Sequence, residues 1–220
     1  MKKLLKNILI FISYFIYEYL FIILLTNSGL DYYKLNMSNK IILLLIFNII
    51  YVFTLVFFYY PEIKKDFKDY KKNYKQYLKK YVSIYILGII LMAFSNIILQ
   101  YITKLELSGN EENIRLLIKK YPLYIAFSSI IYAPFVEEIV FRKIIKNIID
   151  KKYIFIVLSG IVFGALHISD YSNINQILMG IPYIIMGIDF AYIYYKTNNI
   201  FTTMTFHLCH NLILFLLQLI

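Results

Sequence analysis

Residues 121–145 read YPLYIAFSSIIYAPFVEEIVFRKII, a mostly apolar stretch that also contains charged residues. It is long enough to cross a bilayer as a helix, because about 20 mostly apolar residues span the hydrocarbon core. Six more stretches of this kind lie near residues 8–25, 41–60, 82–103, 153–169, 177–195 and 200–220. The sequence therefore predicts an all-α fold, a polytopic transmembrane helical bundle of about seven spans.

The composition of the whole chain agrees with this prediction. Of its 220 residues, 60% are hydrophobic and only 16% are charged, whereas a soluble domain has about 45–50% apolar and about 25% charged residues. An ordinary soluble domain and a disordered chain are both excluded. The single cysteine, Cys209, also excludes an intrachain disulfide framework.

The basic residues predict an orientation. If the N-terminus lies inside, 17 of the 23 Lys and Arg residues fall in inner segments and 6 in outer segments. Cytoplasmic loops of membrane proteins carry such an excess. The net charge of +10 therefore indicates a cytoplasmic N-terminus, and with seven spans an external C-terminus, rather than a nucleic-acid partner. With an Ile-, Lys-, Asn- and Tyr-rich composition, we expect a multi-pass protein of a prokaryotic plasma membrane, with the lipid bilayer as partner.

Polar chemistry divides the chain into two predicted parts. Residues 1–119 hold almost purely apolar helices and a basic cytoplasmic segment with eight lysines between Pro61 and Lys80. We favour a solvated loop for this segment, with an amphipathic helix on anionic headgroups as the alternative. Residues 120–220 carry nearly all the intramembrane polar residues and form the predicted catalytic core.

Two adjacent carboxylates, Glu137 and Glu138, form the strongest signal in the chain, because charge inside a bilayer is costly. Glu138 and Arg142 are four residues apart on one helix face and can form an ion pair. Glu137 points about 100° away and is free to act as a general base. The alternative is an interfacial helix end, since Lys143 and Lys146 follow.

His167 is predicted to lie at the same depth as Glu137. The spans that carry these two residues are joined by a short turn around 150–152, so they should form an antiparallel hairpin in which both residues are equally far from the turn. Gly160 and Gly164 precede His167 with the spacing that allows two helices to approach closely. The hairpin therefore predicts a carboxylate and an imidazole at one site.

The last span places His207, His210 and Asn211 on nearly one helix face. Imidazole and amide groups of this kind can stabilise an oxyanion, although a polar helix–helix contact would have the same pattern. Glu18 stands alone in the first span. Asp189 is expected to cap or orient a basic neighbour, and whether it or His210 contributes to chemistry stays open.

These residues resemble the three motifs of the CPBP family. The motifs are Glu137-Glu138-x-x-x-Arg142, Phe163-x-x-x-His167 and His207-x-x-x-Asn211, in the family's order and each on a separate predicted helix. The family comprises CAAX prenyl endopeptidases and bacteriocin-processing or immunity proteases, and is also called Abi. The resemblance covers roughly residues 120–220.

The resemblance implies an intramembrane endopeptidase acting on a membrane-associated or lipid-modified peptide. It implies that Glu137, helped by His167, activates water, that His207 and Asn211 stabilise the oxyanion, and that Glu138 and Arg142 organise the site. A bacterial source would favour bacteriocin maturation or immunity over CAAX processing.

The cofactor stays open at this stage. Glu137, His167 and His207 could supply three ligands to a divalent metal such as zinc, or the glutamate could act without a metal.

Two other functions remain as alternatives. A proton- or ion-coupled transporter could use buried Glu and His residues as a relay, but it would be expected to have discontinuous helices or matching halves. A non-catalytic membrane immunity or scaffold protein would use the motif residues only to pack helices.

Overall fold

The computed structural model describes residues 2–29 and 31–219, which contain helices and no β-strand. Helical segments long and apolar enough to cross a membrane are Lys2–Asn27, Met37–Thr103, Pro122–Ile148, Ile174–Thr197 and Ile200–Leu217, and Lys152–Ala165 is a shorter apolar helix. The seven predicted spans overlap these segments, and two of them fall on Met37–Thr103. The predicted helical membrane bundle is confirmed.

The elements follow one another along the chain as follows. They are α1 (Lys2–Asn27), η1 (Tyr32–Lys34), α2 (Met37–Thr103), α3 (Gly109–Lys120), α4 (Pro122–Ile125), η2 (Ala126–Tyr132), α5 (Ala133–Glu137), η3 (Glu138–Ile144), α6 (Ile145–Ile148), α7 (Lys152–Ala165), α8 (Ile174–Leu178), α9 (Ile181–Thr197) and α10 (Ile200–Leu217). Segments α4 to α6 form one continuous rod in which η2 and η3 are π-helical.

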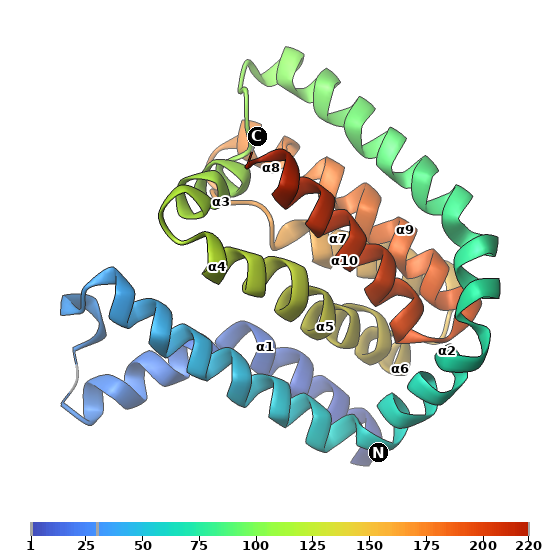
Figure 1. The fold of residues 1–220 in the computed structure, drawn as a ribbon, viewed down its shortest axis with the longest axis horizontal. Coiled ribbons are helices and arrows are strands. Elements are labelled where there is room, and N and C mark those ends of the chain that lie inside the picture. The colour runs from blue at the N-terminus through green and yellow to red at the C-terminus, as the bar shows by residue number, and fades with distance from the viewer. Residues whose placement is uncertain (1, 30, 220) are drawn as a thin grey trace.

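Helix α2 is the most unusual element, because it is a single helix of 67 residues that contains two predicted spans. It changes direction at the right of the view in Figure 1, beyond Pro61. Proline removes a backbone hydrogen bond and commonly bends a helix. The segment between the spans, residues 61–80, is helical throughout and is called the elbow below. The favoured prediction of a solvated loop for this segment is therefore wrong.

The elbow, the start of α1 and two interhelical turns meet at one end of the bundle, called the basic end below (Figure 1). Lys6 Nζ donates to the carbonyl of Phe58 at 3.1 Å, and Lys143 Nζ lies 2.7 Å from an oxygen of Asp66. Lys146 Nζ donates to Asn198 at 2.8 Å. These contacts hold segments far apart in the sequence at one level.

The opposite end of the bundle, called the distal end below, contains α3 and the C-terminal end of α10. Gly109 N donates to Gln176 Oε1 at 2.9 Å, and Gln218 Nε2 donates to Glu111 Oε1 at 2.6 Å. Ser108 precedes helix α3, and its hydroxyl caps the helix by accepting from Glu111 N. Short polar contacts therefore hold these segments together at this end.

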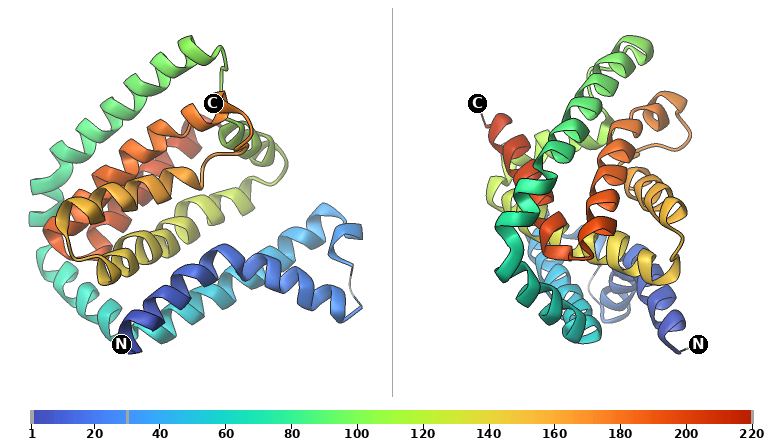
Figure 2. Two further views of the ribbon diagram at one scale, coloured as in Figure 1. Left: turned by 180° about the vertical axis from the view of Figure 1, so that it is seen from behind. Right: turned by 90° about the vertical axis from the view of Figure 1, so that its right-hand side faces the viewer.

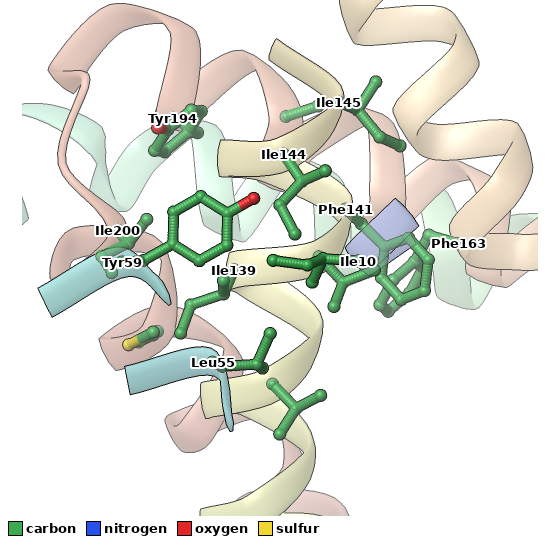
Figure 3. Packing of buried hydrophobic residues seen from close by; sticks show 14 of the residues in the cluster. Ile10, Leu55, Tyr59, Ile139, Phe141, Ile144, Ile145, Phe163, Tyr194 and Ile200 are labelled. Carbon is green, nitrogen blue, oxygen red and sulfur yellow. The ribbon is translucent and has the colours of Figure 1, made fainter. Parts of the chain in front are cut away.

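A buried cluster joins α1 and α2 to the C-terminal helices near the basic end. Figure 3 shows Leu55 and Tyr59 of α2 beside Ile139 of η3, with Ile10 of α1 close to Phe141. All but Ile10 of these side chains are fully buried. The shared cluster fixes η3 and its charged residues against the first two helices.

Close packing of α7 against α9 sets the position of His167. The two helices lie side by side in Figures 1 and 2. A β-carbon added at Gly160 would lie 2.8 Å from the backbone nitrogen of Ile188, and one added at Gly164 would lie 2.7 Å from that of Ile184. The predicted close approach at these glycines is confirmed. The predicted hairpin turn is also present, between Ile148 and Lys152.

Candidate active site

A cavity of about 400 Å³ lies between the C-terminal helices and extends toward α3 at the distal end. Five of the polar residues predicted from the sequence line it, and they come from α5, α10 and the turn after α7. They are Glu137, His167, His207, His210 and Asn211. The rest of the wall is mostly apolar, with Met92, Ile118, Leu214 and Phe215 among its residues.

Glu138 and Arg142 lie behind this wall and are fully buried. Arg142 Nε is 3.2 Å from Glu138 Oε2, which confirms the predicted ion pair. Arg142 also donates to Ser159 Oγ at 3.1 Å, and Ser159 in turn donates to the Phe141 carbonyl at 2.8 Å. The guanidinium lies 4.7 Å from the centre of the Phe163 ring. A buried ion pair needs such additional partners to offset its desolvation.

His207 connects the two carboxylates. Its Nδ1 is 2.9 Å from Glu138 Oε1, and its Nε2 is 3.8 Å from Glu137 Oε2. Its ring stacks on Phe190 at 5.0 Å. Because a carboxylate only accepts hydrogen bonds, Nδ1 carries a proton and Nε2 is the nitrogen that faces Glu137. The sequence did not indicate this link between the first and third motifs.

His167 is held by a different set of contacts. Its Nδ1 lies 2.9 Å from the carbonyl of Phe163, so Nδ1–H donates, and Nε2 makes no hydrogen bond to another residue of 2–29 and 31–219. The ring stacks on Tyr183 with a centroid distance of 4.3 Å and an angle of 15°. Within the described residues no hydrogen bond or ion pair joins His167 to Glu137, but both side chains line the same cavity, as the hairpin predicted.

Asn211 and His210 complete the polar wall on α10. Asn211 Nδ2 donates to the carbonyl of Ser129 at 2.7 Å, which leaves its second N–H and its oxygen for other partners. The His210 ring lies 6.4 Å from the ring of Tyr85, edge to face. The three polar residues predicted for one face of the last helix do share the cavity.

Four residues near the site were not selected from the sequence. Tyr14 of α1 lines the cavity, and its ring meets Phe141 edge to face at 5.2 Å. Tyr183 stacks on His167, Ser159 binds Arg142, and Ser129 receives the hydrogen bond from Asn211. The chain has 23 tyrosines and 11 serines, and only tertiary contacts distinguish these four from the others.

Glu18 and Asp189 lie outside the cavity wall. Glu18 is exposed and accepts a hydrogen bond from Tyr17 at 3.2 Å. Asp189 is buried against Gly88 of α2, where an added β-carbon would lie 2.8 Å from its Cγ. Its Oδ2 has no hydrogen-bond partner among the described residues, so the predicted capping of a basic neighbour is not seen.

The three residues considered as zinc ligands do not form a ligand set in this arrangement. Among residues 2–29 and 31–219, no three His, Cys, Asp or Glu side chains lie close enough together to hold a metal ion. His167 and His207 each donate Nδ1–H to a protein acceptor, as metal-bound histidines commonly do, so the mismatch lies in the separation of the three side chains and not in their hydrogen bonds. The donor groups present therefore do not fit a three-ligand site.

Comparison with known proteins finds a family model similar to the C-terminal half of the chain. The model of the Rce1-like family, type II CAAX prenyl endopeptidases, matches residues 119–213, the region that carries the three motifs. Residues 119–213 therefore resemble this family, in agreement with the three motifs.

A curated bacterial relative agrees. Over 115 residues the chain is 34% identical to the Bacillus subtilis (strain 168) protein named "Putative membrane peptidase YdiL", a match that covers 51% of this chain and 44% of that protein. The chain thus matches less than half the length of this relative. No solved structure gives a significant match.

Proposed function

We propose that the protein is an intramembrane endopeptidase that hydrolyses a peptide bond in a membrane-associated or lipid-modified peptide. The proposal rests on one observation, which is that the same cavity is lined by Glu137, His167, His207 and Asn211. The mostly apolar remainder of the wall suits a hydrophobic peptide segment.

In the proposed first step, Glu137 removes a proton from a water molecule that also donates to Nε2 of His167. The water oxygen attacks the carbonyl carbon of the peptide, and the carbonyl electron pair moves onto its oxygen. The absence of a direct bond between Glu137 and His167 in the described part of the chain leaves both groups able to bind the same water. A general base within reach of the attacking water typically contributes about 10²–10⁴-fold.

The oxyanion that forms would be stabilised by the second N–H of Asn211 and by Nε2–H of His207. Donation from His207 requires a proton on both ring nitrogens. The buried carboxylate of Glu138, 2.9 Å from Nδ1, is the acceptor for one of these two protons. The tetrahedral intermediate then collapses, the C–N bond breaks, and Glu137 returns its proton to the leaving amine.

Glu138 and Arg142 would act as positioning residues in this mechanism. Arg142 fixes one oxygen of Glu138, and the other oxygen fixes the ring of His207. Neither residue lines the cavity. Their removal would therefore disorganise the site rather than delete a reacting group.

The test is cleavage of a peptide library by purified protein in detergent or vesicles. Glu137→Ala, His167→Ala and His207→Ala are each expected to lower the rate by about 10²-fold or more. Glu18→Ala, which removes an exposed carboxylate away from the cavity, is the matched control and should keep full activity. Unchanged cleavage in all three site variants would refute the assignment of the site.

A further inference from the structure

The elbow has three distinct faces, which a step of about 100° per residue defines. Seven of its eight lysines fall within an arc of about 120° on that projection, and all eight are exposed. Its three acidic residues, Glu62, Asp66 and Asp69, lie outside this arc. The outer surface of the elbow is therefore a basic face without a carboxylate, formed by Lys64, Lys65, Lys68, Lys71, Lys72, Lys75 and Lys79.

A second face ties the elbow to the helices of the site. Asp66 is buried and pairs with Lys143, which follows Arg142 directly. Asp69 Oδ2 accepts from Asn199 Nδ2 at 2.8 Å, and Tyr70 OH lies 2.6 Å from Thr205 Oγ1 on α10. These contacts engage Asp66 and Asp69 within the protein, and the basic face lies on another side of the helix.

A third face, beside the basic one, is aromatic and apolar. Phe67 is 47% exposed and Tyr74 is 40% exposed, and they lie on the same side of the helix. A helix with a basic face next to exposed aromatic rings is typical of segments that lie in the interface of a membrane. Both ends of the elbow continue into apolar spans, which keep it at that level (Figure 1).

We propose that the basic face of the elbow binds the headgroups of anionic phospholipids, with Phe67 and Tyr74 placed at the acyl boundary. An acidic protein or a nucleic acid would also match the charge, but neither would account for the exposed aromatic face or for the spans at both ends. This inference does not depend on peptidase activity. It also connects the lipid composition of the membrane with the candidate active site, because Asp66 of the elbow pairs with Lys143, which follows Arg142.

The test uses the absence of tryptophan from the chain. Phe67→Trp introduces a single fluorophore beside the basic face, in vesicles of phosphatidylcholine and phosphatidylglycerol at a fixed ratio. Bromine is placed on the acyl chains of one lipid or of the other. We expect brominated phosphatidylglycerol to quench about twofold to fivefold more strongly than brominated phosphatidylcholine at equal mole fraction. High salt should reduce this difference.

Two variants that each lose four positive charges distinguish lipid binding by the elbow from a general attraction of the basic protein to anionic lipids. Replacing Lys64, Lys68, Lys71 and Lys75 by Gln should equalise quenching by the two lipids. The control variant replaces four exposed lysines outside the basic end by Gln, namely Lys34, Lys104, Lys119 and Lys120. It should still be quenched more strongly by brominated phosphatidylglycerol than by brominated phosphatidylcholine. Tyr74→Trp provides a second reporter if Phe67→Trp alters the fold. Equal quenching by both lipids in the chain with all its lysines would overturn the proposal.

Discussion

Glu137 and Glu138 are adjacent in the sequence, but their side chains have different surroundings. Glu137 is 14% exposed and faces the cavity, whereas Glu138 is fully buried between Arg142 and His207. We expect Glu137→Gln to abolish cleavage without lowering the free energy of unfolding. Glu138→Gln leaves Arg142 buried without its counterion, which costs about 3–5 kcal/mol. Thermal unfolding of both variants, measured beside cleavage, checks this contrast.

A double substitution distinguishes lost pairing from lost packing. If the cost of Glu138→Gln comes from the unpaired guanidinium, adding Arg142→Met should restore part of the stability, because it removes the orphaned charge. Activity should stay low in the double variant, since His207 still lacks its carboxylate. Equal destabilisation by Glu137→Gln and Glu138→Gln would contradict the different roles assigned to them.

Tyr183 is the residue that we expect to position the ring of His167. Its hydroxyl lies 3.3 Å from Ser108 Oγ, so it also links the start of α3 to the site. Tyr183→Leu removes the stacked ring and should lower kcat about tenfold with little change in KM. Tyr183→Phe keeps the ring and should stay close to the unaltered protein.

The same substitution in a His167→Ala background makes the prediction for Tyr183 specific. If Tyr183 acts through His167, Tyr183→Leu should have no further effect there, because coupled residues are not additive. A full tenfold loss in both backgrounds would show that Tyr183 acts on the substrate or on the fold instead. Steady-state kinetics on one cleaved peptide provide all four values.

At the scale of elements, packing of α7 against α9 is expected to limit stability. Gly164→Ala places a β-carbon 2.7 Å from the backbone nitrogen of Ile184, which cannot move as a side-chain end would. We expect a loss of about 1–3 kcal/mol in the free energy of unfolding. Val157→Leu, which enlarges a residue 48% exposed on the same helix, is the control and should have almost no effect. Unfolding in mixed micelles measures both.

The helices of the site were more predictable than the elbow, for a physical reason. Motif spacing on a helix fixes which residues share a face, so the Glu138–Arg142 pair and the shared wall of His207 and Asn211 followed from sequence alone. The lysine-rich segment has the composition of a loop as well as of a helix. Its helical state accompanies contacts such as Asp66 with Lys143, which are 77 residues apart and have no local signal.

The contact between the first and third motifs could not be predicted from the sequence either. The bond from His207 to Glu138 joins residues 69 apart, and only the packing of α10 against η3 brings them together. The hairpin argument predicted His167 at the depth of Glu137, and the resemblance implied that His207 belongs to the same site. It could not predict which nitrogen meets which oxygen, since that depends on side-chain rotation within the assembled cavity.

At the scale of the whole molecule, the basic end and the cavity lie on opposite levels of the bundle. The cavity reaches α3 and Gln218 at the distal end, while the elbow lies at the basic end. If the lysine excess marks the cytoplasm, as it does in most membrane proteins, the cavity faces the exterior. The peptide to be cleaved would then approach from outside the cell or from the outer leaflet.

This orientation predicts the labelling of two engineered cysteines in a Cys209→Ser background. Lys75 on the elbow and Glu112 on α3 are both exposed, so either can carry the reporter. A membrane-impermeant maleimide should label Glu112→Cys in intact cells, and Lys75→Cys only after the membrane is permeabilised. Labelling of Lys75→Cys from outside would reverse the orientation, and the substrate would then have to reach the cavity from the cytoplasm. Both variants are made in the same Cys209→Ser background, so the expression and the thiol reactivity of one can be compared directly with those of the other.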